Sequence, residues 1–278
     1  MTTLLELTGS GSLSYSSMAS YLDCGERYRL EKVAKVPQSE AWWFVGGSAL
    51  HKATEYLDLG EVNDPTEAWD KAFAAEIAQI NDVASLRAGG RATKEFPNKE
   101  DGAWWSHHGP VFVQRWVDWR TSTGWSLAFV EQPFEVEIGD VMVRGYVDRG
   151  FVDANGQGIV VDLKTGRHMP PALQLAMYRL GLVKVLDQHF DIGAYWSART
   201  GTIGDLQHLP RFSEELVGKW LHNVKSGIEA GLFTPRLSAL CGSCSVNQYC
   251  AAYGGTPPVL DDIFFGPNAT SHNEKEGH

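Results

Sequence analysis

The chain has 278 residues, of which 43% are hydrophobic and 21% are charged, and its formal net charge is −10. This composition is ordinary for a folded protein of one large or two small domains. The negative charge argues against a protein that coats nucleic acid non-specifically, because phosphate binding depends on Lys and Arg. No segment is apolar enough to span a bilayer, and the N-terminus lacks the basic and apolar parts of a secretory signal. We therefore expect a cytoplasmic protein with no membrane partner.

The first half of the sequence predicts helices. Apolar residues recur at helical spacing in four segments, at about 16–33, 47–57, 65–87 and 109–119. Residues 87–102 are polar and charged, which is typical of a loop. We expect residues 1–13 to form a flexible N-terminus and residues 14–120 to form a mainly helical portion.

The middle of the sequence predicts strands, because β-branched and aromatic residues alternate there between turn formers. The expected strands are residues 127–138, 141–151, 158–164 and 192–197. Further helices are expected at about 170–186 and at 213–230, and residues 254–278 lack periodicity and predict a mobile tail. The sequence thus indicates an α/β core with helices on both sides of the strands in chain order.

Two acidic residues stand on the neighbouring predicted strands 141–151 and 158–164. Asp148 lies on the first strand and Asp162 on the second, and Lys164 leaves the same face as Asp162. A carboxylate pair attracts a divalent cation such as Mg²⁺ or Mn²⁺, which polarises a phosphodiester and lowers the pKa of a bound water. The pair alone leaves open that both aspartates are turn residues and that Lys164 is a surface lysine.

Four short segments strengthen the metal interpretation. They read Gly-Gly-Ser-Ala-Leu-His at 46–51, Gly-Tyr-Val-Asp-Arg at 145–149, Val-Val-Asp-Leu-Lys-Thr-Gly at 160–166 and Gln-Leu-Ala-Met-Tyr at 174–178. In order and spacing they resemble the motifs of the RecB-type nucleases of the PD-(D/E)XK group, with Asp-x-Lys in place of the commoner Glu-x-Lys. The resemblance covers residues 14–253. It implies a restriction-endonuclease-like fold, with a central mixed sheet flanked by helices and a catalytic core at 127–200.

The resemblance also implies roles for individual residues. It makes His51, Asp148 and Asp162 the ligands of Mg²⁺ or Mn²⁺, together with the carbonyl of Leu163, and it makes Lys164 the catalytic lysine. A histidine on a helix is usually structural, so the assignment of His51 depends on the resemblance alone.

Other residues are expected near the substrate. By the resemblance Gln174 and Tyr178, which lie four apart on one helix face, contact DNA, although Tyr178 can instead pack in the core and Gln174 can cap the helix. Thr165 and Arg167 follow the catalytic lysine directly and are candidates for phosphate contacts. Glu131 is a candidate for an additional acid that binds a second metal or a water, or it is a solvated carboxylate.

The chain has four cysteines. Cys241, Cys244 and Cys250 form a C-x₂-C-x₅-C pattern, and Cys24 lies in the first predicted helix. Four thiolates suit either zinc or an iron–sulfur cluster, and their spacing does not choose between the two. The arrangement resembles the iron–sulfur motif of the AddB nuclease domain and of the CRISPR-associated RecB-like exonucleases. This implies a [4Fe–4S] cluster that joins the N-terminal region to the segment 241–250; zinc and four unrelated buried cysteines are the alternatives.

Basic and aromatic residues outside the motifs have two interpretations. The loop 87–102 carries Arg87, Arg91, Lys94 and Lys99, a candidate DNA-guiding arm, although runs of charge are usually solvated faces. The ten tryptophans include the adjacent pairs at 42–43 and 104–105, which can stack on bases but more often fill a core.

The function implied by the resemblance is that of a metal-dependent DNA exonuclease. It would hydrolyse phosphodiester bonds at DNA ends and favour single strands, in recombination, repair or spacer capture. The sequence has no G-x-x-x-x-G-K-[ST] phosphate loop, so the chain would act alone or with recombination or CRISPR-adaptation partner proteins. The alternatives are a structure-selective endonuclease with the same chemistry and a non-catalytic module that binds DNA ends or a partner.

Overall fold

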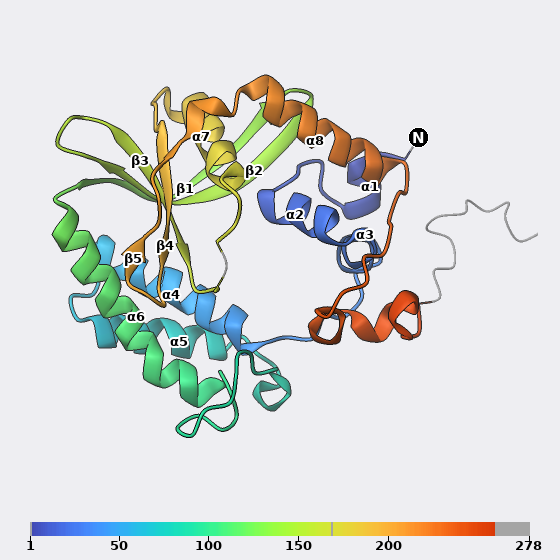
Figure 1. Ribbon diagram of the computed structural model, residues 1–278, viewed down its shortest axis with the longest axis horizontal. Coiled ribbons are helices and arrows are strands. Elements are labelled where there is room, and N and C mark those ends of the chain that lie inside the picture. The colour runs from blue at the N-terminus through green and yellow to red at the C-terminus, as the bar shows by residue number, and fades with distance from the viewer. Residues whose placement is uncertain (1, 168, 259–278) are drawn as a thin grey trace, which may run out of the picture.

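A six-stranded mixed sheet runs through the centre of the computed structural model, which describes residues 2–167 and 169–258 (Figure 1). The strands are β1 (Ser126–Ile138), β2 (Val141–Val152), β3 (Gly158–Lys164), β4 (Ile192–Ser197), β5 (Thr202–Ile203) and β6 (Gln207–His208). Their order is β1-β2-β3-β4-β5, with β6 also pairing with β4. Only β3 and β4 pair in parallel among the described strands; the other pairs are antiparallel. This is the mixed α/β core expected from the sequence.

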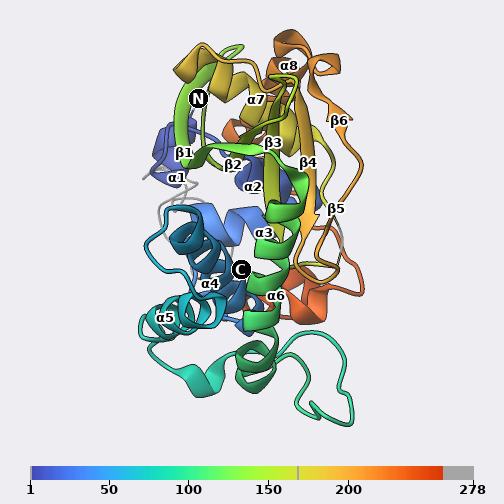
Figure 2. The same cartoon turned by 90° about the vertical axis from the view of Figure 1, so that its left-hand side faces the viewer.

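Helices cover the sheet. They are α1 (Leu4–Thr8), α2 (Tyr15–Asp23), α3 (Gly25–Tyr28), α4 (Trp42–Asp58), α5 (Pro65–Ile77), α6 (Gly102–Thr123), α7 (Leu173–Leu186) and α8 (Glu214–Glu229). In both views α7 and α8 lie in the upper part of the molecule, and α4, α5 and α6 lie in the lower part (Figure 2). None of the described helices combines the length and the apolar character that crossing a membrane requires.

The buried apolar residues form two large clusters. One joins α1, α2, α7 and α8 to β1 and β2, and the other joins α4, α5 and α6 to β3 and β4. The second cluster contains most of the tryptophans, and four of them are completely buried: Trp69, Trp105, Trp116 and Trp196. These tryptophans therefore fill the core, whereas Trp43 remains only half-buried.

The strands agree closely with the sequence. Both β3 and β4 have the bounds expected from their apolar runs, and β1 and β2 differ from expectation by one residue at an end. The turn between β1 and β2 contains Gly139, whose φ of +67° is a conformation that glycine adopts without steric cost. Sequence analysis missed only the two-residue strands β5 and β6, which are too short to show a period.

The N-terminus differs from the expected flexible segment. Residues 4–8 form the short helix α1, which begins with a capping box between Thr3 and Glu6. Leu4 and Leu7 are buried, and the backbone N–H of Leu4 donates to Glu229 at the end of α8. Contact with a helix more than 200 residues away therefore orders this segment, and local sequence gives no sign of that contact.

The helix expected at 16–33 is interrupted. It consists of α2, α3 and a π-helical turn at Arg29–Val33, and Cys24 between α2 and α3 has an extended backbone with φ −159° and ψ 106°. A Cβ on Gly25 would come within 2.8 Å of the backbone nitrogen of Thr234. The chain therefore breaks where the C-terminal segment crosses it closely, and this contact places Cys24 beside that segment.

Other helices begin or end at residues different from those predicted. The helix expected at 65–87 ends at Ile77, whereas α4 and α6 begin several residues earlier than expected. The segment 78–101 is mostly irregular, apart from a 3-10 turn at Val83–Ser85 and single bridges. The expected mobile tail lies largely outside the described residues, which end at 258.

Candidate active site

Three carboxylates lie at one level across three adjacent strands. The β2–β3 ladder pairs Arg149 with Val161, so Asp148 and Asp162 occupy the neighbouring positions just beyond it. On the other side of β2, Glu131 of β1 lies at the level of Asp148. The two aspartates thus stand on adjacent strands, as the sequence predicts, and a third acid joins them.

The first cluster of possible ligand atoms comes from three elements. His51 of α4 places Nδ1 3.5 Å from Oδ2 of Asp148 and 3.9 Å from Oε1 of Glu131. One ligand atom from each of these residues lies within 4.8 Å of the others. Burial opposes protonation of His51, but the charges of Asp148 and Glu131 outweigh it and raise the pKa of the imidazole. One imidazole nitrogen with two carboxylates is a donor set that fits a divalent metal ion.

Asp162 sits beside this cluster and is only 1% exposed. Its Oδ2 lies 2.5 Å from Nζ of Lys164 and has no well-oriented hydrogen-bond donor among the described residues. Burial and repulsion from Asp148 raise the pKa of Asp162 to about 7. A buried carboxylate that resists ionisation next to two other acids would be stabilised by a cation, so the residues present fit a divalent ion.

Gln174 and Tyr178 hold the other oxygen of Asp162. Both come from α7 and are buried; the Gln174 amide donates to Oδ1 at 2.9 Å and the Tyr178 hydroxyl donates to it at 3.1 Å. Gln174 also donates to the Tyr178 hydroxyl at 2.7 Å. In this geometry the two residues position Asp162, and their expected contact with DNA stays a prediction.

Glu131 has a strained backbone, with a φ of +49° that non-glycine residues rarely adopt. Such strain persists where the surroundings enforce it. Here the guanidinium of Arg149 donates to Oε1 of Glu131 at 2.9 Å. Burial favours the neutral acid, but interactions with His51 and Arg149 lower the pKa of Glu131 and keep it charged. The structure therefore assembles Glu131 with the metal-ligand candidates, a choice that the sequence left open.

Arg149 is a buried residue that sequence analysis did not assign. Its guanidinium donates to Oδ2 of Asp58 at 2.6 Å, to the carbonyl of Asp148 at 2.7 Å and to the hydroxyl of Thr54 at 2.9 Å, besides Glu131. The side chain is completely buried, so these acceptors replace water around its charge. The only sequence signal is its place directly after Asp148.

Of the remaining predicted site residues, Leu163 contacts this group directly. The backbone N–H of Leu163 donates to Oδ2 of Asp148 at 2.8 Å; the ligand role of its carbonyl stays a prediction. Thr165 is half-buried, and Arg167 is exposed and donates to Glu100 at 2.9 Å. Contacts of Thr165 and Arg167 with phosphate also stay predictions.

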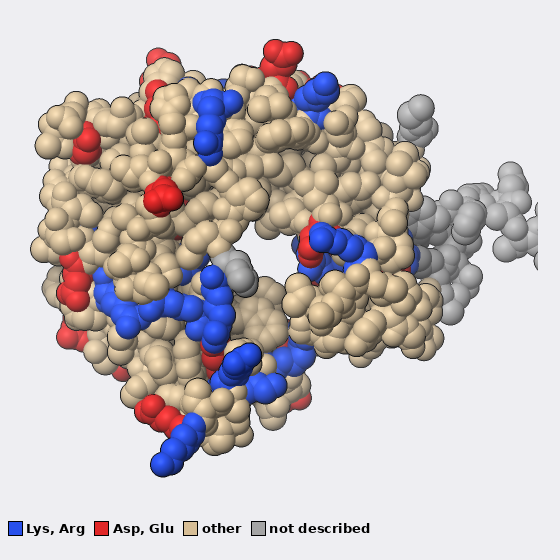
Figure 3. Space-filling view, viewed as in Figure 1, with Lys and Arg blue, Asp and Glu red and all other residues tan. Residues whose placement is uncertain are grey.

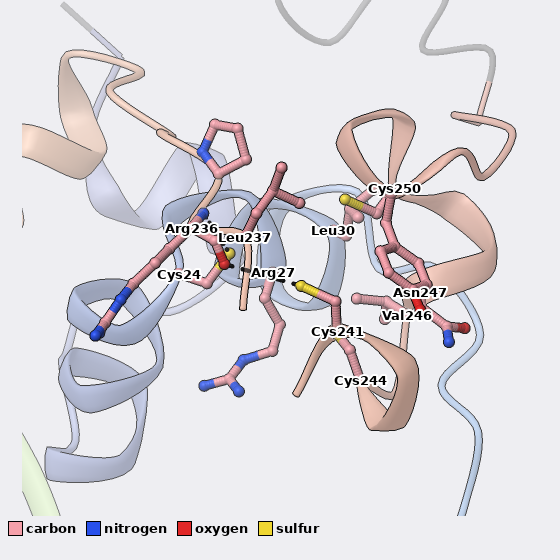
Figure 4. A pocket seen from close by; sticks show the side chains of 12 residues that line it. Cys24, Arg27, Leu30, Arg236, Leu237, Cys241, Cys244, Val246, Asn247 and Cys250 are labelled. Atoms are coloured by element: carbon pink, nitrogen blue, oxygen red, sulfur yellow. Dashed lines mark hydrogen bonds between the residues drawn. The ribbon is translucent and has the colours of Figure 1, made fainter. Parts of the chain in front are cut away.

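The four cysteines line one cavity outside the group of metal-ligand candidates (Figure 4). Backbone N–H groups point at two of the sulfurs: Arg236 donates to Sγ of Cys24 at 3.4 Å, and Ser238 donates to Sγ of Cys241 at 3.3 Å. All four cysteines are free of disulfides. Within the described ranges, no three of the sulfurs lie within 4.8 Å of one another.

Most of the chain is similar to known proteins. Residues 12–251 match the model of the PD-(D/E)XK nuclease superfamily. The chain is 28% identical over 273 residues to the Gene 69 protein of Mycobacterium phage D29 and 26% identical over 290 residues to that of phage L5, and each match covers 86% of this chain and 96% of the relative. A crystal structure of a candidate exonuclease from Eubacterium rectale is 12% identical with a TM-score of 0.48, and the match covers 87% of this chain and 90% of that one.

Proposed function

We propose that this chain, which belongs to the PD-(D/E)XK nuclease superfamily, is a metal-dependent exonuclease that hydrolyses phosphodiester bonds at DNA ends and favours single strands. The observation that carries the proposal is the assembly of His51, Glu131 and Asp148 within 4.8 Å, beside the buried Asp162 and its half-buried partner Lys164. Acidic ligands next to a lysine suit phosphodiester hydrolysis, because the substrate and its transition state are both negatively charged.

Each residue has a distinct proposed role. His51, Asp148 and Asp162 bind Mg²⁺ or Mn²⁺ together with the carbonyl of Leu163, and Glu131 is an additional acid at the same cluster. A cation held there would polarise the phosphate and lower the pKa of a water.

The lysine and the residues around it are proposed to neutralise the charge of the substrate, orient Asp162 and contact phosphates. Lys164 neutralises charge on the phosphate, and the hydrogen bonds from Gln174 and Tyr178 fix the orientation of Asp162. Thr165 and Arg167 follow Lys164 and are proposed to contact DNA phosphates.

The test compares labelled linear and circular single strands in the presence of Mn²⁺ or Mg²⁺. We expect degradation of the linear strand from its ends, no cleavage of the circle, and loss of activity in Asp162→Asn but not in Asp153→Asn, a change in the exposed β2–β3 turn. Cleavage of the circle would instead support a structure-selective endonuclease. DNA binding without any cleavage would support a non-catalytic module.

The proposed setting is recombination, repair or spacer capture in the cytoplasm, with recombination or CRISPR-adaptation proteins as partners. These assignments rest on the motif resemblance. Pull-down with proteins of these processes tests them, and activity that no such partner changes would argue for a chain that acts alone.

We also propose that Cys24, Cys241, Cys244 and Cys250 bind a [4Fe–4S] cluster. Zinc would hold its thiolates about 3.8 Å apart, as tetrahedral geometry with Zn–S bonds of about 2.3 Å requires. The sulfurs line one cavity, yet no three of those described lie that close, and backbone N–H groups donate to two of them. Hydrogen bonds of this kind tune iron–sulfur clusters. Visible absorption and iron content of anaerobically purified protein test the proposal, and a colourless preparation loaded with zinc would refute it.

A further inference from the structure

A groove of about 760 Å³ lies outside both sites described so far. One wall is formed by residues 87–90 and 97–99, the two ends of the segment 87–99, which we call the basic loop. The opposite wall is the turn Gly242–Ser243 between two of the cysteines. Trp43, in the first turn of α4, also lines the groove and is only half-buried there. An aromatic ring, a basic segment and open space therefore occur together.

The basic loop has a charge opposite to that of the whole chain. It contains four Lys or Arg residues and one Glu, which gives +3 in a chain of net charge −10. Arg91, Lys94 and Lys99 are exposed, and none of them forms an ion pair with any described residue. Lys and Arg side chains gather over the lower part of the face in Figure 3, where Figure 1 places this loop. Three cations without protein partners favour an anionic ligand.

Arg87 has a different role in the same loop. Its guanidinium donates to the carbonyl of Ser243 at 2.8 Å and to that of Ser39 at 3.1 Å, and it lies 5.3 Å from the centre of the Trp43 ring. Arg87 therefore connects the two walls of the groove and helps to orient the Trp43 ring. The three exposed cations remain available to a ligand.

The groove is coupled to the candidate active site from two directions. At the end of the basic loop Glu100 accepts hydrogen bonds from Arg199, whose Nε donates to the carbonyl of Thr165 at 2.7 Å, one residue after Lys164. On α4, Trp43 precedes His51 by eight residues, which is about 12 Å along a helix. The groove thus begins about two helical turns from the metal-ligand candidates.

We propose that this groove binds the single-stranded DNA that leads to the candidate active site, with a base against Trp43 and a phosphate at Lys99. Further phosphates of the strand lie at Arg91 and Lys94, on the part of the basic loop outside the groove lining. This inference rests on the proposed nuclease function and specifies where the DNA substrate lies as it approaches the candidate active site. Exposed cations track a phosphate backbone, and an aromatic ring takes an unpaired base by stacking. A duplex keeps its bases stacked inside, so the aromatic contact favours a single strand.

The charge test compares two variants with the same change in net charge. Arg91→Gln/Lys94→Gln alters the basic loop, and Lys71→Gln/Lys219→Gln alters exposed lysines of α5 and α8 that form no ion pair with described residues. Fluorescence anisotropy with a labelled oligo-dT strand in EDTA measures binding at several salt concentrations without cleavage. We expect the slope of log K against log salt to become shallower by about 1.4 in the loop variant only, since each lost phosphate contact removes about 0.7. Equal slopes in the two variants would overturn the inference.

The stacking test uses Trp43→Leu. We expect about tenfold weaker binding of oligo-dT, which corresponds to about 1.4 kcal/mol, and little change for an abasic strand of the same length. Equal losses for both strands, or tighter binding of duplex than of single strand by the unaltered protein, would overturn the proposed occupant.

A small ester separates this inference from the proposed function. Bis-p-nitrophenyl phosphate can reach the candidate metal centre without filling the groove, so the loop variant and Trp43→Leu should hydrolyse it at the unaltered rate. One outcome is that the unaltered protein hydrolyses neither the ester nor DNA while the two variants still differ in the slope of log K against log salt. In that case the nuclease proposal fails and the inference that the groove binds DNA is supported. If hydrolysis is normal and the slopes agree, the groove inference fails alone.

Discussion

The candidate active site and the cysteine cavity are held together in different ways. Asp148 and Asp162 lie on paired strands; the backbone N–H of Leu163 on β3 donates to Asp148, and the buried Gln174 of α7 donates to Asp162. The cysteine segment 241–253 has only 3-10 turns, and its small apolar cluster has Leu30, Val36 and Val246 as its buried members. The comparison teaches that the fold supplies the first site before any ligand binds. The second site has few buried contacts of its own, so the proposed cluster would supply much of its stability.

The largest effect on the candidate active site is expected from Asp162→Asn. It removes a proposed ligand while keeping the shape and the hydrogen-bond acceptor for Tyr178. We expect the rate of phosphodiester hydrolysis with Mn²⁺ to fall by at least about a hundredfold, because even residues outside the ligand set commonly cost 10- to 100-fold. Single-turnover kinetics on linear single-stranded DNA measure the change. A rate within threefold of the unaltered protein would remove Asp162 from the mechanism.

The same variant tests how the Asp162 carboxyl group changes the pH dependence of stability in the metal-free protein. The folded protein raises the pKa of Asp162 from 3.8 to about 7, so it holds a proton that the unfolded chain releases. The metal-free protein should therefore lose stability as the pH rises from about 4 to 7, because the folded state then binds more protons. Thermal unfolding in EDTA should show this loss in the unaltered protein and a smaller one in Asp162→Asn. Identical profiles would contradict the raised pKa.

A smaller effect is expected from Arg149→Lys. Lysine keeps the charge, but it cannot donate at once to Asp58, Glu131 and Thr54 in the fixed geometry of a guanidinium. We expect hydrolysis to slow about tenfold and the melting temperature to fall, since partners outside the ligand set and buried ion pairs both contribute. Arg120→Lys is the matched control, because Arg120 also contacts Asp58 but is partly exposed. Equal behaviour of the two variants would deny Arg149 a role at the site.

Tyr178→Phe should have a modest effect. It removes one of two hydrogen bonds to Oδ1 of Asp162 and leaves the ring in the core. A single hydrogen bond contributes about 1 kcal/mol, so we expect the rate to fall about fivefold. If Tyr178 instead contacts DNA, the Michaelis constant for DNA should rise while the hydrolysis of bis-p-nitrophenyl phosphate stays unchanged. The two substrates together therefore distinguish the two roles.

The smallest effect on the candidate active site is expected from Cys250→Ser. We expect the rate with bis-p-nitrophenyl phosphate to change less than about twofold, since ordered strands hold that site independently of the cavity. Limited proteolysis should cut the segment 234–258 much faster than in the unaltered protein. DNA binding should weaken as well, because this segment forms one wall of the groove. A large loss with the small ester would show that the two regions are not independent.

Features that depend on contacts between residues near in sequence could be predicted, whereas features that depend on distant residues could not. A short apolar run between turn formers predicts β3, and the period of two along a strand then places Asp162 and Lys164 on one face. Arg149 was missed because its partner Asp58 lies 91 residues away, and the acids it binds have no common pattern. Glu131 remained open for the same reason: its place at the cluster depends on a strained backbone that Arg149 and His51 support. The break at Cys24 depends on the close approach of Thr234, which local propensity does not encode.

The meeting of the chain ends has a consequence for synthesis. Cys24 and Arg236 touch across 212 residues, and α1 packs on α8, which is close to the other end of the described chain. A ribosome therefore releases α1, α2 and Cys24 first, yet the contact of α1 with α8 and that of Cys24 with Arg236 form only after those later parts have emerged. The strands and α4 can fold earlier, so α1, which is synthesised first, would be among the last elements to pack in its native position. A chain that stops before α8 would then keep the sheet but leave α1 without the helix on which it packs.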